Sequence, residues 1–421
     1  MVLLAGDLFH DNKPTRRTIH KTMNILRRYT MGPNPISFQI ISDQKKNFRS
    51  TIYPHHTVNY ENPYMSIDLP IFSIHGNHDD PTRDSGGDEM LAALDILAMG
   101  NLVNYFGRQD EVDKVQVSPI LIKKGETKLA LYGMGSMRDE RLNRMWQGKK
   151  VRFLKPIEEK DTNGSRYNND DNDDESDDEN EWFNIFALHQ NRDLGRGTKN
   201  CVHESMIPDW MDLVVWGHEH ECSIEAAESA VGTFRITQPG SSVATSLTEG
   251  ESLPKHVGIL DVRGSQFRLK PIPLMQVRPF AMGSICLSAD TALDAEDIRV
   301  EDAMGEELAK EVEKLIEEAR DDSRLLKYKN RGNENGNCND ISLTKQLEFH
   351  VDKPERVLVR LKVEHSGFST LHNQRFGSKF VNEVVRFSKY EKVFFSSIYN
   401  ELILKFVCLF LVSTYNTFIE G

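Results

Sequence analysis

Four short stretches of the sequence combine Asp, Asn and His, and each follows an apolar run that reads as a buried strand. They are "GDLFH" (6–10), "HGNHDD" (75–80), "ALHQN" (187–191) and "GHEHE" (217–221). A single histidine after a strand is more often structural than a ligand. Four such stretches in one segment reverse that expectation, because α/β sheets collect functional groups at the carboxyl ends of their strands. Oxygen and nitrogen donors without thiolates favour Mn²⁺, Fe or Zn²⁺ over a structural zinc.

The residue types in these stretches suit the parts of a two-metal site. Asp7 follows Gly6 in a tight turn and suits a carboxylate that bridges two cations about 3.5–4 Å apart. Asn77 offers an amide oxygen and His189 an imidazole. His218 and His220 lie two apart, so in extended chain both rings would project to one side.

A further histidine, His78, is predicted to act as an acid or to hold a phosphate rather than to bind metal. It is adjacent to Asn77, but its side chain is expected to point in a different direction from that of Asn77. Asp79 is expected to hold the orientation of His78. "GDxxH" and "GNHD" alone do not choose between a nuclease, a protein phosphatase and a small-nucleotide phosphodiesterase.

Apolar runs alternate with amphipathic stretches up to about residue 279, which predicts a layered α/β domain. The expected helices are 15–30, 87–99 and 138–147, and the expected strands are 1–5, 71–76, 128–135, 182–189, 211–220, 232–240 and 255–262. Beyond residue 279 a helix at 301–322 and an alternating strand at 356–366 predict a second, smaller domain.

Composition is that of a globular protein and excludes little. The 421 residues carry a net charge of −12, of which the acidic, low-complexity segment 160–181 contributes about −8, so nucleic acid is not excluded as a ligand. Five scattered cysteines predict neither a disulfide framework nor a thiolate zinc site, and favour a reducing compartment. The apolar run 402–412 is far shorter than the roughly 20 residues of a membrane span, so no membrane association is expected.

In their order, "GDLFH", "GNHD", "HQN" and "GHEH" resemble the calcineurin-like metallophosphoesterases. Longer strings such as "LAGDLFHDNKPTRRTIH", "FSIHGNHDDP", "FALHQNR" and "LVVWGHEHEC" are similar to the double-strand-break repair nucleases of that family, the meiotic-recombination-eleven type, over roughly residues 1–385. The resemblance implies an α-β-β-α sandwich with a smaller α+β capping domain. It also implies a nuclear, manganese-dependent DNA 3′–5′ exonuclease and endonuclease that acts in recombination, end joining, meiosis and telomere maintenance.

The same resemblance implies roles for individual residues. Asp7 would bridge two Mn²⁺ ions, with Asn77, His189 and His218 completing one site and His220 belonging to the other. His78 is similar to the family's general acid and His10 to a residue that positions the scissile phosphate.

Domains and partners also follow from the resemblance. The expected division is a nuclease domain (1–280), a capping and DNA-binding domain (281–388) and a divergent apolar tail (389–421), with a partner-binding insertion at 32–69 and an acidic disordered insert at 160–181. The implied partners are DNA, a Rad-fifty type ATPase, a nibrin-type regulatory subunit that contacts the insertion, and a second copy of the chain. Helices 87–99 and 138–147 would form the homodimer interface, although ordinary packing on the sheet explains them equally well.

The sequence departs from the family before Asp7. Family members have an Asp-x-His string some forty residues earlier, which ligates the metal held by His220; here only six residues precede Asp7. We therefore expect one incomplete metal site and an unpaired edge on strand 1–5. An alternative function is then a catalytically impaired, truncated form that acts as a dimerisation and partner-binding protein.

Overall fold

The structure is a computed structural model that describes residues 1–48, 57–83, 90–109, 111, 113–156, 167–168, 182–193, 200–321, 356–369, 371, 373–384 and 410–413. These residues form two compact units. One comprises 1–242, 256–272 and 402–420, and the other comprises 243–255 and 273–401 together with residue 421. Most of the acidic insert and of the apolar tail lies outside the described residues, as do residues 49–56 of the predicted partner-binding insertion.

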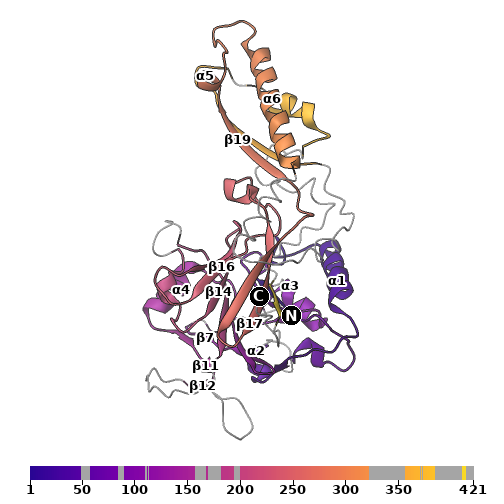
Figure 1. Cartoon of the computed structure of the whole chain (residues 1–421), viewed down its shortest axis with the longest axis vertical. Coiled ribbons are helices and arrows are strands. Elements are labelled where there is room, and N and C mark those ends of the chain that lie inside the picture. Colours follow the sequence, from indigo (N-terminus) through magenta and orange to yellow (C-terminus); the bar gives the residue numbers. More distant parts are fainter. Residues whose placement is uncertain are drawn as a thin grey trace, which may run out of the picture. The chain divides into compact units, whose positions relative to one another are not determined.

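The first unit is built on two sheets (Figure 1). One sheet has the order β18-β17-β21-β1-β3-β6, and its strands are β1 (Val2–Ala5), β3 (Ile71–Ile74), β6 (Asn104–Tyr105), β17 (His256–Arg263), β18 (Gln266–Pro273) and β21 (Phe410–Ser413). The other has the order β15-β16-β14-β13-β9-β8-β2, and its strands are β2 (Gln39–Ile40), β8 (Ile120–Lys124), β9 (Thr127–Met134), β13 (Phe183–His189), β14 (Leu213–Gly217), β15 (Ser223–Glu228) and β16 (Arg235–Gln238).

Alternation along the strands explains why the sheets stack. Leu3 and Ala5 of β1 belong to a buried cluster shared with residues of β13 and β14, whereas Val2 and Leu4 pack on the opposite face with residues of two helices. Those helices are α1 (Arg16–Thr30) and α3 (Ala93–Met99). The outer face of the second sheet packs in the same way against α4 (Asp139–Gln147). The predicted α-β-β-α sandwich is therefore confirmed.

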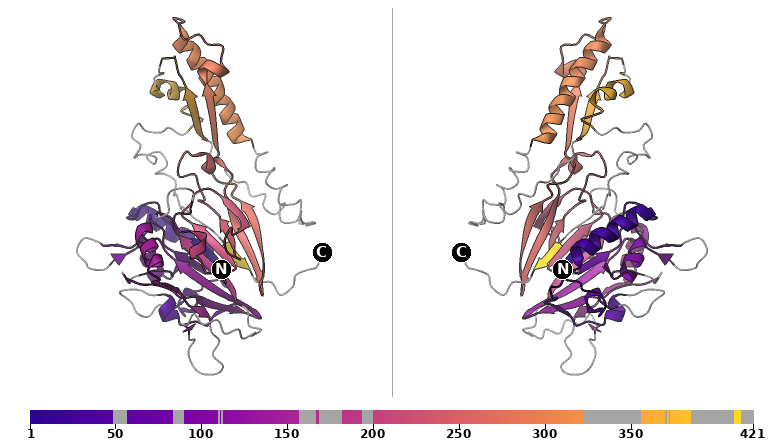
Figure 2. Two further views of the ribbon diagram at one scale, coloured as in Figure 1. Left: turned by 90° about the vertical axis from the view of Figure 1, so that its left-hand side faces the viewer. Right: turned by 90° about the vertical axis from the view of Figure 1, so that its right-hand side faces the viewer.

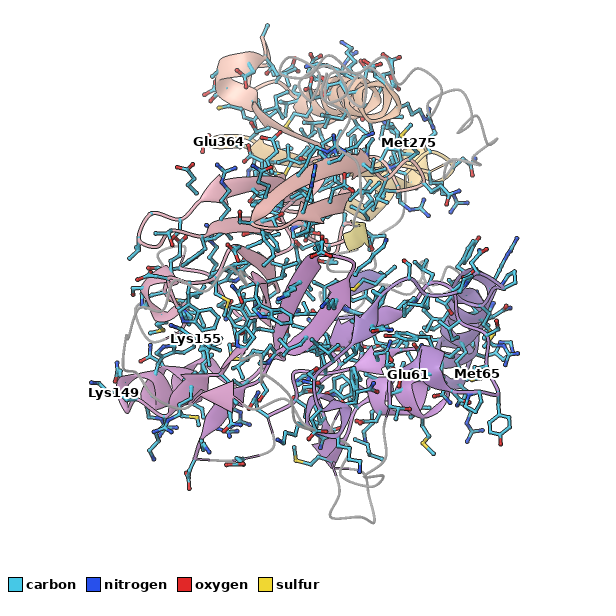
Figure 3. The ribbon with its side chains drawn as sticks, turned by 60° about the horizontal axis from the view of Figure 1, so that its bottom comes forward. Glu61, Met65, Lys149, Lys155, Met275 and Glu364 are labelled. Carbon is cyan, nitrogen blue, oxygen red and sulfur yellow. The ribbon has the colours of Figure 1, made fainter. Side chains whose placement is uncertain are left out.

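The two helical layers lie on opposite sides of the unit. In Figure 1, α4 lies on one side of the paired sheets, and α1 and α3 lie on the other. Figure 3 likewise places Lys149, just after α4, and Glu61, in the 3-10 helix η1 (Asn59–Glu61), on opposite sides. The remaining short elements of this unit are α2 (Gln44–Asn47), η2 (Glu204–Met206), β4 (Thr82–Arg83) with β5 (Met90–Leu91), β7 (Val115–Val117) with β10 (Val151–Phe153), and β11 (Lys155–Pro156) with β12 (Tyr167–Asn168).

Both edges of β1 are paired, so the expectation of an unpaired edge was wrong. β3 runs parallel to β1 on one side. β21, the yellow strand in Figure 2, pairs antiparallel on the other side, and Val2 is opposite Leu411 in the register. β21 also pairs in parallel with β17, where Ile259 lies opposite Leu411. A strand from the apolar tail thus lies between β1 and β17.

The second unit has its own small core. β19 (Phe280–Cys286) and β20 (Leu358–Glu364) pair in parallel, and α6 (Val300–Arg320) covers them through Leu308, Val312 and Leu315. The unit also contains α5 (Leu287–Asp290), α9 (Asn373–Gly377) and the 3-10 helices η3 (Glu249–Ser252) and η4 (Ser378–Phe380). Helix 301–322 and strand 356–366 were predicted from the sequence, but β19 was not.

One predicted helix begins later than expected. Residues 90–91 of the predicted helix 87–99 form strand β5, and α3 starts at Ala93, where the side chain of Asp95 accepts a 2.7 Å hydrogen bond from the Ala92 N–H. Residues 87–89 lie outside the described residues.

Candidate metal centre

Four donor atoms converge where four strands end. Asp7 follows β1, Asn77 follows β3, His189 ends β13 and His218 follows β14. The Asn77 Oδ1 atom lies 3.1 Å from His189 Nε2 and 2.9 Å from His218 Nδ1. His189 Nε2 is in turn 3.5 Å from Asp7 Oδ2. The two sheets therefore bring together residues that are up to 211 positions apart in the sequence.

Hydrogen bonding fixes which nitrogen of His189 faces the centre. Its Nδ1 lies 2.7 Å from the carbonyl oxygen of Ala5, so Nδ1–H donates there. A neutral imidazole that donates from one nitrogen carries a lone pair on the other. The Nε2 lone pair of the fully buried His189 thus points at the oxygens of Asn77 and Asp7.

His218 is oriented in the same manner. Its Nε2 lies 2.9 Å from Asn191 Oδ1, which can only accept, so Nε2–H donates and Nδ1 presents its lone pair to Asn77 Oδ1. The carboxylate atom Asp7 Oδ2 is buried and accepts no hydrogen bond in the described structure. Two oxygens and two imidazole nitrogens with converging lone pairs form a donor set that fits a divalent cation.

The structure holds Asp7 as a carboxylate despite its burial. Desolvation alone would raise its pKa, but the electrostatic interaction with His189, whose Nε2 lies 3.5 Å from Asp7 Oδ2, and the 2.9 Å hydrogen bond from the His78 N–H outweigh burial and hold the pKa well below its usual value. Asp7 has a φ of 54°, a left-handed conformation that Asp tolerates better than most residues. Gly76 allows the close approach, because a Cβ there would lie 2.0 Å from Asp7 Oδ1.

The two predicted catalytic histidines lie next to each other, on the rim of this cluster. The rings of His10 and His78 stack with centroids 4.8 Å apart and an interplanar angle of 21°. His78 Nδ1 lies 2.7 Å from the carbonyl oxygen of His10 and donates its proton there.

Asp79 does not have the role that was predicted for it. Its carboxylate accepts hydrogen bonds from the backbone N–H groups of Gly76 (2.6 Å) and Phe9 (3.3 Å), and so ties the loops that carry Asn77 and His10. The carbonyl of His10 orients the His78 ring instead. Burial, reinforced by the negative charge of Asp7, raises the pKa of Asp79 to about 6.

The prediction that the rings of His218 and His220 project to one side of an extended chain was wrong. His218 has a φ of 77° at a bend, so the chain is not extended between His218 and His220. The carbonyl of His220 accepts a 3.1 Å hydrogen bond from the N–H of Ser241, which places this residue beside the loop after β16. The placement of His220 on a metal stays a prediction.

Sequence reasoning gave no role to Asn191, although it lies within "ALHQN". Its Oδ1 accepts from His218, and its Nδ2 donates to Asp139 Oδ2 at 2.7 Å, so it positions a donor of the cluster. The neighbouring Arg192 N–H donates to the buried Glu219 at 3.0 Å, between the two histidines of "GHEH". The signal was the position of Asn191 as the third polar residue of this motif.

The fold and the cluster define the class of protein. A family model for calcineurin-like phosphoesterases matches residues 1–222, and the chain belongs to that family, whose members bind divalent metal ions. A model described as the Mre11 DNA-binding presumed domain matches residues 267–389.

The particular relatives are double-strand break repair proteins. The chain is 42% identical to double-strand break repair protein MRE11 of Homo sapiens over 385 residues, which are 91% of this chain and 47% of that protein. Identity to the MRE11 protein of Arabidopsis thaliana is 43% over 388 residues, with 91% and 47% covered, and identity to the double-strand break repair protein mus-23 of Neurospora crassa is 40% over 401 residues, with 92% and 48% covered. The chain spans about half the length of the curated relatives it matches. Within the described residues no helix has the length and apolarity needed to cross a membrane.

Proposed function

We propose that this chain is a nuclease subunit of a double-strand-break repair complex and hydrolyses DNA phosphodiesters with bound manganese. The observation that carries the proposal is the convergence of Asp7 Oδ2, Asn77 Oδ1, His189 Nε2 and His218 Nδ1 at the ends of four strands. Similarity to double-strand break repair proteins over 91% of the chain supports DNA as the substrate.

In this proposal Asp7, Asn77, His189 and His218 hold one Mn²⁺, and Asp7 and His220 contribute to a second. A bound divalent cation supplies positive charge that stabilises the charge developing on the phosphate in the transition state. The low pKa of Asp7 keeps it ionised and ready to bind a cation at neutral pH. Asn191 and the carbonyl of Ala5 keep the donor nitrogens of the two imidazoles turned inward.

His78 and His10 act on the substrate in this mechanism. Because Nδ1–H of His78 is committed to the carbonyl of His10, a proton delivered to a leaving 3′ oxygen comes from Nε2 of the protonated ring. The stacked His10 ring, 4.8 Å away, positions the scissile phosphate beside that proton.

Further partners are proposed from the resemblance: a Rad-fifty type ATPase, a nibrin-type regulatory subunit and a second copy of the chain, with action in the nucleus. Support for the second copy comes from α3, where Ile96 and Met99 are 50% and 52% exposed on a helix whose other face is buried. Exposed apolar side chains that are neighbours on one helix face are typical of an interface.

The test is nuclease activity of the full chain on a labelled duplex, with and without Mn²⁺, beside His78→Asn. We expect manganese-dependent cleavage, and a loss of about 10²–10⁴-fold in rate for His78→Asn at unchanged manganese content. His20→Asn on the exposed face of α1 is the matched control and should cleave normally.

Two results would contradict the proposal. Manganese bound without any cleavage would remove the nuclease function and favour the dimerisation and partner-binding alternative. Full activity in His78→Asn would remove the general-acid role of that residue while leaving the metal centre in place.

A further inference from the structure

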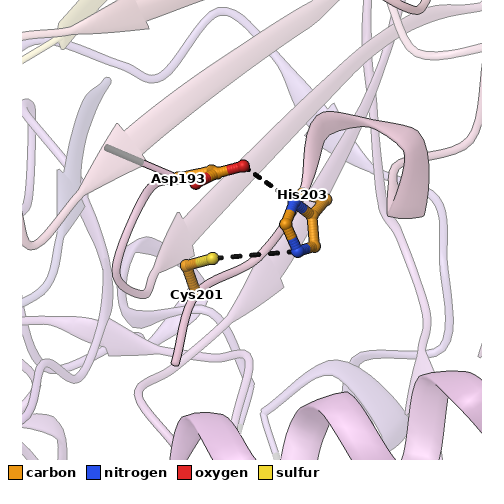
Figure 4. Close-up of side chains that lie close together, drawn as sticks. All are labelled: Asp193, Cys201 and His203. Atoms are coloured by element: carbon orange, nitrogen blue, oxygen red, sulfur yellow. Dashed lines mark hydrogen bonds and ion pairs between the residues drawn. The ribbon is translucent and has the colours of Figure 1, made fainter. Parts of the chain in front are cut away.

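A second cluster of metal-binding side chains lies outside the phosphoesterase centre. Among the described residues, ligand atoms of Asp193, Cys201 and His203 all lie within 4.8 Å of one another. Figure 4 shows the carboxylate and the thiol facing the two nitrogens of one imidazole. The Asp193 Oδ2 atom is 3.0 Å from His203 Nδ1, and the Cys201 Sγ atom is 3.9 Å from His203 Nε2.

With one ligand atom taken from each residue, the three atoms lie within 4.8 Å of one another, a wider span than the ligand separations around a bound zinc ion. Zn–S bonds of about 2.3 Å and Zn–N and Zn–O bonds of about 2.0–2.2 Å place tetrahedral ligands about 3.3–3.6 Å apart. The 3.0 and 3.9 Å contacts end on different ring nitrogens, and an imidazole gives a cation only one of them, so the three side chains must close from the 4.8 Å span toward this range when they bind the ion.

The backbone holds the two halves of this cluster together without a metal. The Val202 N–H donates to the carbonyl of Asn191 at 2.9 Å, and Arg192 and Val202 form an isolated parallel bridge. Asp193 is therefore held next to Cys201 and His203 by the chain itself. A site whose ligands are ordered in advance pays less conformational entropy when it binds.

Burial and charge at the cluster favour a cation over a reactive cysteine. The Cys201 residue is only 2% exposed, whereas the side chains of His203 and Asp193 are 27% and 47% exposed and leave a path to solvent. Burial, together with the negative charges of Asp193 and Asp139, raises the pKa of the Cys201 thiol, which makes it a poor nucleophile when no cation is present. The same negative potential attracts a divalent ion, whose charge then stabilises the thiolate.

We propose that Asp193, Cys201 and His203 bind a zinc ion, separate from the manganese centre, that links the chain after β13 to the segment before η2. One sulfur, one nitrogen and one oxygen donor form a borderline-soft set that suits Zn²⁺ better than Mn²⁺. Among the described residues the cluster supplies three ligands, and water would take the fourth tetrahedral position. A thiolate zinc site was not predicted, because the five cysteines form no close pairs; the signal in the sequence was the Cys201-x-His203 spacing.

Cobalt substitution tests this site, because a thiolate bound to Co²⁺ gives a near-ultraviolet charge-transfer absorption that the sulfur-free donors of the phosphoesterase centre cannot give. We expect this absorption when Co²⁺ is added to the full chain, and its loss when one equivalent of Zn²⁺ follows. Cys201→Ser should abolish the absorption, and His203→Gln should weaken cobalt binding at least tenfold.

Cys222→Ser is the matched control. The Cys222 thiol also lies near a histidine, 3.6 Å from His256 Nδ1, but among the described residues these two are not part of a group of three possible metal ligands. The Cys222→Ser variant should therefore keep the full absorption. Circular dichroism without metal should be the same for all variants, and if Cys201→Ser does not fold, His203→Gln decides. No absorption in the unmodified chain, or absorption that disappears in Cys222→Ser, would overturn the proposal.

Discussion

Single hydrogen atoms decide what the phosphoesterase centre can bind. His189 and His218 each donate from one ring nitrogen to an oxygen outside the cluster, so that the other nitrogen faces Asn77 Oδ1. A lone pair that faces another lone pair at about 3 Å is unfavourable unless a cation or a proton lies between them. The orientation of the two imidazole rings therefore favours binding of a metal ion.

At this scale Gly76 is as important as the ligands. We expect Gly76→Ala to lower manganese affinity at least about tenfold, because a Cβ 2.0 Å from Asp7 Oδ1 must displace the carboxylate. Isothermal titration with Mn²⁺ measures this. Gly305→Ala in α6 is the control, since a Cβ there meets nothing within 4 Å, and it should leave affinity unchanged while stabilising the helix by up to about 1 kcal/mol. Normal manganese affinity in Gly76→Ala would show that Asp7 is not the ligand we propose.

Among the elements, the strands that carry the site followed from the sequence better than their connections did. β1, β3, β13 and β14 were expected because each is an apolar run that stops at a polar cluster. The left-handed turn at His218 was not, since a positive φ at a histidine leaves no mark in hydrophobic periodicity.

β19 was missed for a related reason. Gly283 interrupts the strand pattern, and a glycine lowers strand propensity. In the fold that glycine is useful, because a Cβ there would lie 3.1 Å from the methyl groups of Leu315, so its absence lets α6 pack close to the strand. Tertiary packing of this kind is not visible in a local pattern.

Helix α3 provides the test of self-association. We expect Ile96→Asp to weaken a homodimer at least about tenfold, because it places a charge on the exposed apolar face of the helix. Sedimentation velocity over a range of concentrations measures the dissociation constant. Val231→Asp, at a residue 65% exposed in the loop before β16, is the control and should leave it unchanged. A chain that sediments as a monomer at all concentrations would exclude α3 as a dimer interface.

Over the whole molecule, the least predictable feature is the contribution of the apolar tail to the central sheet. The hydrophobic pattern predicted no strand at residues 410–413, yet these residues pair with β1 on one side and β17 on the other. Which strands become neighbours depends on long-range topology, and a sequence read locally contains no record of it.

The position of β21 between β1 and β17 predicts what happens when the backbone N–H of Leu411 is removed. Leu411 lies in register with Val2 and Ile259, so Leu411→Pro should loosen β21 and expose the edges of β1 and β17. We expect the variant to self-associate, as measured by size-exclusion chromatography with light scattering, and to unfold at lower urea concentration. Leu411→Ile keeps the N–H and should behave as the unmodified chain does. If Leu411→Pro stays monodisperse and unfolds at the same urea concentration as the unmodified chain, β21 does not contribute to the sheet in solution.

The scattered origin of the metal donors also has a thermodynamic consequence. Asp7, Asn77, His189 and His218 come together only when both sheets are formed, so an unfolded chain offers a cation no comparable site. A ligand that binds only the native state adds its binding free energy to the free energy of unfolding, about 2.7 kcal/mol at a concentration one hundred times its dissociation constant. Metal supply would therefore set how long the folded molecule persists, independently of any reaction it catalyses.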